Sequence, residues 1–256
     1  MLSAAQLKEF NENGFVRLGR VGASGTHAKL AERINQIMLG EIQNPEITYM
    51  LDSKSGSYDD LEWGNSKWQG STLKYRKIER LDVDPLFWSY TCDPFFVSTC
   101  RQLIAPSIRV FRTMFMNKPA GAGTHLPYHQ DAGNQWGLSQ DPFVTIWTAL
   151  DPATKANGCV EVMPGTHKLG LMSARGHVVD QKKLDEMNAE GSGVFLELEP
   201  GESFLMHNLL FHRSGRNSTN IPRRAYSVCY MDGATRDVRP DSNRVFPLVC
   251  GEPALV

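Results

Sequence analysis

The chain has 256 residues, of which 41% are hydrophobic and 21% are charged, and its formal net charge is −1 at pH 7. This composition is ordinary for a globular protein, and the length allows one domain with a substantial core over residues 1–256. A net charge near zero argues against nucleic acid or an anionic membrane surface as the main partner. No run approaches the roughly 18 apolar residues of a membrane span, so we expect no membrane partner.

The cysteines indicate where the protein works. The five of them are scattered and odd in number, and no C-x-x-C pair occurs. This pattern predicts neither a zinc knuckle nor a dithiol redox site, and free thiols are usual in a reducing compartment. The N-terminal segment has no apolar signal-peptide core, and residues 253–256 (PALV) lack a peroxisomal tripeptide of the S-K-L kind. We therefore expect a cytoplasmic location.

The first hundred residues carry three helical patterns. The first is an amphipathic stretch at residues 4–11, and the third spans residues 94–103 after Asp93, a residue type that caps helices well. The second covers residues 28–39. Its apolar side chains recur at helical spacing and form one stripe made of Leu30, Ile34, Ile37 and Met38.

Residues 52–70 combine Ser, Gly, Asp and Asn with Tyr58, Trp63 and Trp68. The segment is too polar for a core element and too aromatic for an ordinary linker. A mobile lid that closes aromatic side chains over a substrate has this composition. A surface loop whose aromatic side chains pack locally has it too, so the sequence leaves both interpretations open.

From Ile108 onward the pattern changes to short apolar runs separated by Gly, Pro, Asn and Asp. Six runs predict strands, at residues 109–116, 142–150, 159–163, 193–198, 202–208 and 224–231. Short strands with long connections predict a mainly β fold, a double-stranded β-helix (the jelly-roll, cupin-like barrel) flanked by the N-terminal helices. A long insert at residues 174–193 contains a charged helical piece at 181–190, which we interpret as a surface crossover.

The tripeptide His129-Gln130-Asp131 and the distant His212 form a possible metal-binding set. In a strand, the side chains of residues i and i+2 point to the same face, so His129 and Asp131 can approach one metal together. Two histidines and one carboxylate are the ligands of mononuclear non-haem iron sites that keep open coordination positions. The tripeptide alone is a weak signal, since a surface or turn histidine would give the same letters.

Eleven residues after His212 comes the pair Arg223-Arg224. A guanidinium group stays charged when it is buried and pairs bidentately with a carboxylate, which suits a carboxylate-bearing co-substrate. Strand alternation places Arg223 and Arg224 on opposite faces, and the spacing does not choose between them. The alternative is that both arginines face solvent.

Two further histidines lie near these motifs. His207 precedes His212 by five residues, so in a continuous strand the two side chains point to opposite faces. We expect His207 to be a hydrogen-bonded core residue. His125 lies close to the strand of the His129 tripeptide, and we expect it at the mouth of the pocket.

Taken together, these motifs resemble the phytanoyl-CoA dioxygenase family of Fe(II)- and 2-oxoglutarate-dependent oxygenases, and the resemblance covers nearly the whole chain. Several blocks in the right order are far more specific than any one of them. The blocks are residues 111–119 (FRTMFMNKP), 128–131 (YHQD), 147–151 (WTALD), 157–159 (NGC), 163–168 (MPGTHK) and 212–215 (HRSG).

The resemblance implies a role for each matching residue. The iron ligands are His129, Asp131 and His212, and Arg223 rather than Arg224 anchors 2-oxoglutarate. The other 2-oxoglutarate contacts implied by position are Ser214, Trp147, Met114 and Lys77. Relatives that halogenate have a small residue where Asp131 stands, so hydroxylation is favoured. We assign the substrate side of the pocket to Trp63, Trp68, His125 and Gln130.

The expected function is a dioxygenase that uses Fe(II), 2-oxoglutarate and O2 to hydroxylate or otherwise oxidise an unactivated C–H bond of a small molecule, releasing succinate and CO2. Desaturation, cyclisation and epimerisation begin in the same way, and no residue separates them. The alternatives are a non-catalytic cupin-like binding module and a metal-dependent barrel enzyme that does not use 2-oxoglutarate. The sequence is compatible with a monomer or a homodimer.

Overall fold

The computed structural model describes residues 1–61, 66–173 and 178–252. The helices are α1 (Ala4–Asn13), α2 (Thr26–Leu39), α3 (Pro85–Thr91), α4 (Pro94–Leu103) and α5 (Gln181–Glu186). The strands are β1 (Phe15–Arg20), β2 (Thr48–Leu51), β3 (Tyr75–Glu79), β4 (Ile108–Lys118), β5 (Leu126–His129), β6 (Val144–Ala149), β7 (Val160–Val162), β8 (Val194–Leu196), β9 (Glu202–His207), β10 (His212–Ser214), β11 (Arg223–Asp232) and β12 (Leu248–Cys250).

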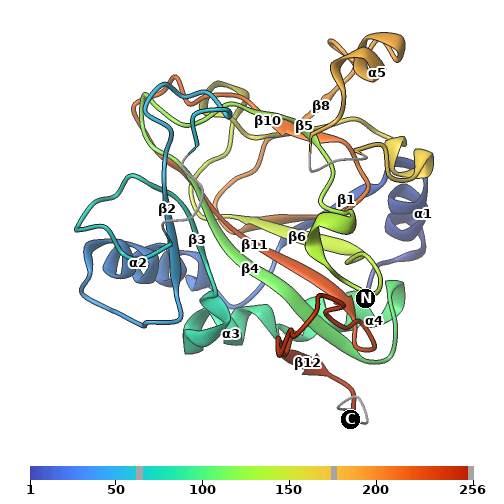
Figure 1. Cartoon of the computed structure of the whole chain (residues 1–256), viewed down its shortest axis with the longest axis horizontal. Coiled ribbons are helices and arrows are strands. Elements are labelled where there is room, and N and C mark those ends of the chain that lie inside the picture. The colour runs from blue at the N-terminus through green and yellow to red at the C-terminus, as the bar shows by residue number, and fades with distance from the viewer. Residues whose placement is uncertain (62–65, 174–177, 253–256) are drawn as a thin grey trace.

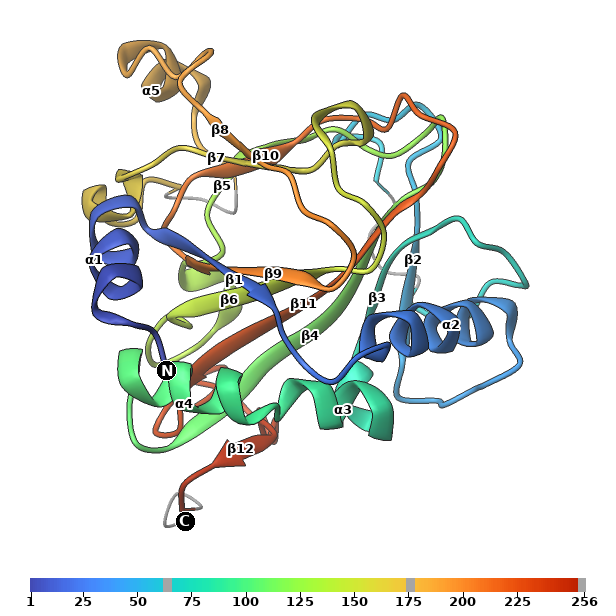
Figure 2. The same cartoon turned by 180° about the vertical axis from the view of Figure 1, so that it is seen from behind.

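The strands form two antiparallel sheets. The larger sheet has the order β1-β9-β6-β11-β4-β3-β2, with β12 also paired to β4, and the smaller sheet has the order β5-β10-β7-β8. Figures 1 and 2 show the smaller sheet above the larger one, with α2, α3 and α4 against the other face of the larger sheet. The jelly-roll fold is thus confirmed, but no strand ladder joins the two sheets within the described ranges, so the predicted barrel is an open sandwich.

The three predicted helices are confirmed. In α1, Ser3 accepts a hydrogen bond from the backbone of Gln6 in a capping box, and the helix ends at Gly14 with φ +80°. The stripe predicted for α2 is buried. Asp93 caps α4 as expected. The short helix α3 and the strands β1 to β3 were not predicted, since each is short and has a mixed polar pattern.

Alternation along β11 divides the interior into two cores. Tyr226, Val228 and Tyr230 pack between the larger sheet and the helices. Ala225 faces the space between the two sheets, where it packs with Trp147 and Phe204. The space between the sheets therefore receives the residues that alternate with the helix-facing core, and this is where polar side chains of β4 and β11 gather.

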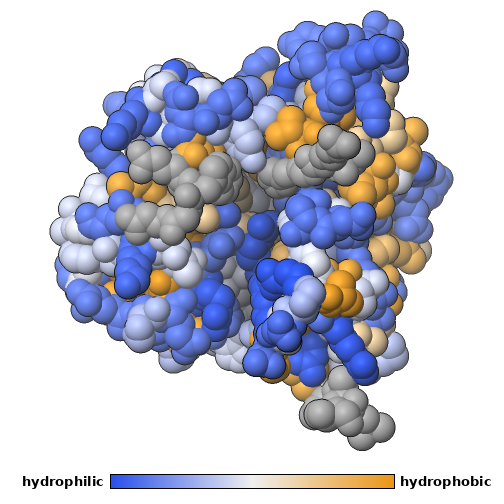
Figure 3. Space-filling model, in the orientation of Figure 1, coloured by the Kyte–Doolittle hydropathy of each residue, from blue (hydrophilic) through white to orange (hydrophobic). Residues whose placement is uncertain are grey.

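The surface around this space is mostly hydrophilic. Figure 3 shows a hollow near the centre of the face that is turned to the viewer in Figure 1. The insert after residue 173 carries α5, which projects beyond the smaller sheet; the helix covers Gln181–Glu186 and is shorter than predicted. In the part of the chain that the structure describes, no helix is both long and apolar enough to cross a membrane.

Candidate active site

The structure brings the three predicted metal ligands together. His129 at the end of β5 pairs directly with His212 at the start of β10, and Asp131 follows two residues after β5. One ligand atom from each of the three side chains lies within 4.8 Å of the others, and all three residues are buried. The strand pairing, not the tripeptide alone, closes this set.

Hydrogen bonds orient the two imidazole rings. The Nδ1 atom of His129 lies 2.9 Å from the carbonyl oxygen of Pro127, and that of His212 lies 3.0 Å from the carbonyl oxygen of Leu210. A carbonyl oxygen only accepts, so each Nδ1 carries the hydrogen and each Nε2 keeps its lone pair for a metal. This second hydrogen bond on each ring is the usual arrangement for metal-binding histidines. The donor set therefore fits a divalent metal such as iron.

Arg223 enters the same cavity from β11. It is 2% exposed, and its Nε and Nη1 atoms have no hydrogen-bond partner among the described residues. Its guanidinium lies 5.4 Å from the centre of the Trp147 ring, and burial lowers its pKa to about 10. A buried guanidinium with unused donors is suited to a carboxylate supplied by a ligand.

Arg224 points to the other face of the sheet. It forms a bidentate pair with Asp151, at 2.7 and 2.6 Å, and donates to the side chain of Asn35 in α2 at 2.7 Å. The interpretation that both arginines face solvent is therefore wrong. Strand alternation places Arg223 inward and gives Arg224 a structural role.

The cavity joins the metal ligands to Arg223. Strands β4 and β11 form part of its wall. In their ladder Met114 lies opposite Ser227, and Lys118 lies opposite Arg223. The other predicted co-substrate residues also line it, namely Ser214, Trp147 and Lys77. Tyr58 of the possible lid lines it as well, together with residues to which the sequence gave no role, among them Arg112, Met116 and Met206.

Comparison with known proteins identifies the family to which the chain belongs. The sequence profile of the family described as Phytanoyl-CoA dioxygenase (PhyH) matches residues 10–225. The chain belongs to the phytanoyl-CoA dioxygenase family. Its predicted enzyme class, the non-haem iron dioxygenases that use 2-oxoglutarate, is confirmed with it.

Relatives within and around the family are distant in sequence. The chain is 26% identical to a probable phytanoyl-CoA dioxygenase of Caenorhabditis elegans, over 90% of this chain and 75% of the relative. It is 27% identical to the peroxisomal phytanoyl-CoA dioxygenase of Rattus norvegicus, over 90% of this chain and 68% of the relative. A probable alpha-ketoglutarate-dependent hypophosphite dioxygenase of Stutzerimonas stutzeri is 25% identical, over 89% of this chain and 78% of the relative.

Solved structures share the fold. The crystal structure of EctD from S. alaskensis with 2-oxoglutarate and 5-hydroxyectoine has a TM-score of 0.74 and 19% identity, and the similarity covers 99% of this chain and 86% of EctD. The carbocyclase SnoK from nogalamycin biosynthesis has a TM-score of 0.73 and 17% identity, covering 97% of both chains. At these identities the likeness establishes the architecture.

Lys77 forms an ion pair at the wall of the metal cavity. Its Nζ atom lies 3.0 Å from Glu79, which lies 3.9 Å from the Nε atom of Arg112. Burial lowers the pKa of Lys77. Burial raises the pKa of Glu79, but the charges of Lys77 and Arg112 outweigh that effect and hold it below its ordinary value. Lys77 is thus a paired cation, whereas Arg223 has no ion-pair partner in the described part of the chain.

Three of the four predicted substrate residues, Gln130, Trp68 and His125, do not line the metal cavity. The amide of Gln130 is fully buried, donates to the carbonyl oxygens of Gly170 and Leu209, and accepts from the backbone of Met172. It ties three chain segments together. Trp68 donates its indole hydrogen to the carbonyl oxygen of Met38. Trp63 lies outside the described residues.

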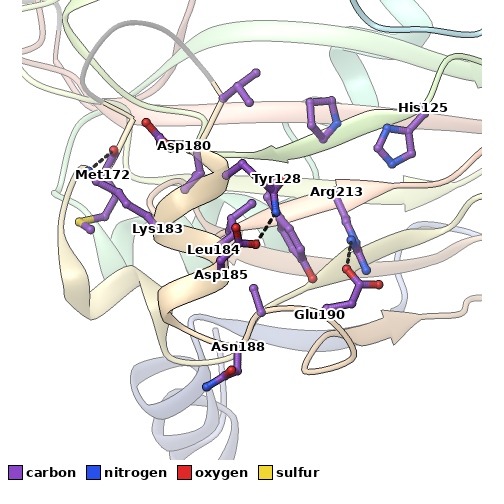
Figure 4. A pocket seen from close by; sticks show the side chains of 15 residues that line it. His125, Tyr128, Met172, Asp180, Lys183, Leu184, Asp185, Asn188, Glu190 and Arg213 are labelled. Atoms are coloured by element: carbon purple, nitrogen blue, oxygen red, sulfur yellow. Dashed lines mark hydrogen bonds and ion pairs between the residues drawn. The ribbon is translucent and has the colours of Figure 1, made fainter.

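His125 lines a different hollow. A cavity of about 950 Å³ lies on the outer face of the smaller sheet, beneath α5. Figure 4 shows Tyr128, Arg213 and Glu190 together at one side of it, with His125 beyond Arg213. Arg213 stacks over the Tyr128 ring at 4.5 Å and also borders the metal cavity. Tyr128 and Arg213 alternate with the metal ligands along their strands, so the sheet separates the two cavities.

The segment 52–70 reaches the metal cavity through Tyr58. The start of the segment is anchored, because the side chain of Asp52 accepts a hydrogen bond from the backbone of Thr124 at 3.1 Å. Its proposed movement as a lid stays a prediction. The hydrogen bond predicted for His207 is present, since the ring accepts the backbone N–H of Leu209 at 3.0 Å and packs against Phe143 at 4.7 Å, but the residue is half-buried and lies at the edge of the core.

Proposed function

We propose that this protein uses Fe(II), 2-oxoglutarate and O2 to hydroxylate, or otherwise oxidise, an unactivated C–H bond of a small molecule, with release of succinate and CO2. His129, Asp131 and His212 would hold the iron, and Arg223 with Ser214 would bind the far carboxylate of 2-oxoglutarate. The observation that carries the proposal is the buried Arg223, which shares one cavity with the three metal ligands and whose Nε and Nη1 atoms have no partner in residues 1–61, 66–173 and 178–252.

The residues of the cavity would hold the metal, position 2-oxoglutarate and exclude water. When bound, iron supplies the activation of O2 coupled to oxidative decarboxylation of 2-oxoglutarate. The Nδ1 hydrogen bonds of the two histidines keep their Nε2 lone pairs directed at the metal site. Arg223 would set the position of the co-substrate along the cavity, and Trp147, Met114 and Met116 would exclude water from it.

Several finer points belong to this proposal. The whole chain, residues 1–256, is taken as one catalytic domain, supported by a family match that runs from residue 10 to residue 225. We place the protein in the cytoplasm, as a monomer or homodimer with no nucleic-acid or membrane partner. The relatives act on substrates as different as phytanoyl-CoA and hypophosphite, so we propose a small-molecule substrate without naming one. A non-catalytic module is not favoured, because all three ligands and Arg223 are present.

An anaerobic titration tests the proposal. Fe(II) and then 2-oxoglutarate are added to the metal-free protein, and a weak visible charge-transfer band is expected only when both are present. Succinate release over a panel of small acids and amino acids then identifies substrates. A protein that binds Fe(II) but gives neither the band nor succinate would be a metalloprotein that does not use 2-oxoglutarate. The Arg223→Met variant should lose the band at 2-oxoglutarate concentrations that saturate the wild type.

A further inference from the structure

A chain of alternating charges runs from the co-substrate side of the cavity to a metal ligand. Lys77 pairs with Glu79 at 3.0 Å, Glu79 lies 3.9 Å from Arg112, and Arg112 lies 3.4 Å from Asp131. All four side chains are at most 22% exposed. The pairing of β3 with β4 brings Glu79 beside Met114, two positions from Arg112 on the same strand. This series of charged side chains is therefore formed by the pairing of strands and not by a local sequence motif.

The two oxygens of Asp131 are divided between two neighbours. Oδ2 lies 3.7 Å from the Nε2 atom of His212, the atom with a free lone pair for the metal. Oδ1 lies 3.4 Å from the Nη2 atom of Arg112, near the limit for a hydrogen bond. One oxygen is thereby directed at the metal site while the other faces a cation. The backbone N–H of Asp131 donates to Asn208 at 2.8 Å and fixes the start of this side chain.

Arg112 itself is held on its other sides. Its guanidinium lies 5.1 Å from the centre of the Trp136 ring and 5.6 Å from that of Phe111. Stacking of this kind restricts the plane of a guanidinium group. A guanidinium group keeps its charge when it is buried, so Arg112 faces Glu79 and Asp131 as a cation. A restrained cation facing one carboxylate oxygen is well placed to select the orientation of that carboxylate.

We propose that Arg112 is a positioning residue that presents Oδ2 of Asp131 to the metal, and that Glu79 neutralises Arg112 so that a cation can stand beside a divalent ion. The inference rests on the metal site of the proposed function. Unpaired, Arg112 would repel the metal across a partly buried gap, where charges interact more strongly than in water. When Arg112 is paired with Glu79, the two side chains together carry little net charge, and Arg112 can still orient Asp131.

Metal affinity, measured without turnover, tests the inference. The metal-free protein is titrated with Co(II) under anaerobic conditions, and both the Kd and the visible d–d spectrum are recorded. Losing the partner of a ligating carboxylate typically weakens metal binding about 10- to 100-fold, and we expect Arg112→Gln to do so with an altered spectrum. Glu79→Gln should weaken binding too, because Arg112 keeps its charge. Arg112→Lys should recover part of the loss in Arg112→Gln.

Arg244 provides the matched control. It stacks on Phe111 at 5.0 Å and donates to the backbone of Phe111. Among the described residues it forms no ion pair with Glu79 or Asp131, and of the charges that lower the pKa of Glu79 its effect is the smallest. Arg244→Gln should bind Co(II) within about twofold of the wild type, since it leaves the ligand partners intact. Wild-type affinity and spectrum in a folded Arg112→Gln variant would overturn the inference, as would an effect confined to substrate KM. If Arg112→Gln does not fold, the same readout on Glu79→Gln and Arg112→Lys decides. A wild type that fails to bind Co(II) would instead refute the metal site.

Discussion

Replacing Arg223 with methionine should weaken the binding of 2-oxoglutarate without lowering the stability of the folded protein. Arg223 is 2% exposed, and burial lowers its pKa from 12.5 to about 10. A change of this size corresponds to a cost of about 3 kcal/mol for keeping the charge in the folded protein without a carboxylate partner. Its contact with the Trp147 ring offsets about 2 kcal/mol of that cost, as a desolvated cation–π pair does. Methionine has no charge to bury and fills a similar volume.

In the absence of 2-oxoglutarate, Arg223→Met should therefore be as stable as the wild type or more stable by about 1 kcal/mol. A difference of that size shifts Tm by about 2–4 °C in a chain of this size. With 2-oxoglutarate the order should reverse. Saturating ligand at 100 times its Kd stabilises the wild type by about 2.7 kcal/mol and the variant hardly at all. Loss of charge-assisted hydrogen bonds worth about 1.5–3 kcal/mol each should raise the KM for 2-oxoglutarate at least about tenfold.

The assay is thermal unfolding of the anaerobic, Mn(II)-loaded protein with and without 2-oxoglutarate, followed by succinate-release kinetics with Fe(II). The reasoning is refuted if Arg223→Met unfolds well below the wild type without 2-oxoglutarate while both proteins gain equally from adding it. That pattern would show that Arg223 is a structural cation and that the co-substrate binds elsewhere.

Three further predictions use the same unfolding measurements. Arg224→Met should show the opposite pattern, a loss of about 2 kcal/mol from breaking the partly buried Asp151 pair with an unchanged KM for 2-oxoglutarate; a large KM effect would mean that the strand faces are misassigned. Gln130→Ala should destabilise the fold by about 2–4 kcal/mol, since it leaves the buried backbone groups of Gly170, Leu209 and Met172 unpaired, and near-wild-type stability would contradict this. Burial, with a smaller effect of His167, lowers the pKa of His207 from 6.5 to about 4. Its neutral ring thus contributes stability above pH 6.5 that is lost as pH falls toward 4, by up to about 3 kcal/mol. Urea unfolding at pH 7 and pH 5 should show a smaller pH effect in His207→Gln, and identical slopes would argue against protonation of this ring.

Local patterns in the sequence were enough to predict most of the scaffold. The helices α1, α2 and α4 follow from apolar spacing and capping residues such as Asp93, because both act within a few positions of the chain. Six of the strands from β4 onward, namely β4, β6, β7, β8, β9 and β11, follow from short apolar runs between turn residues. His129 and Asp131 were predicted to share a site because they are close in sequence, although β5 ends at His129 and Asp131 lies after the strand. These features depend on neighbours in sequence, so the sequence by itself determined them.

Features that depend on which strand lies beside which were decided by the tertiary structure alone. Strand alternation predicted that Arg223 and Arg224 face opposite ways, and the family resemblance favoured Arg223. The packing of α2 against one face of the sheet gives the physical reason, because it occupies the side to which Arg224 points. His125 lines the outer hollow and Gln130 is a buried, hydrogen-bonded residue. Both lie just outside β5, whose register against β10 shifts between Leu126 and His129, so strand alternation does not give the direction of either side chain. Arg112 meets Asp131 only through the pairing of distant strands. No local pattern carries such information, since these contacts join residues whose separation along the chain is unrelated to their distance in space.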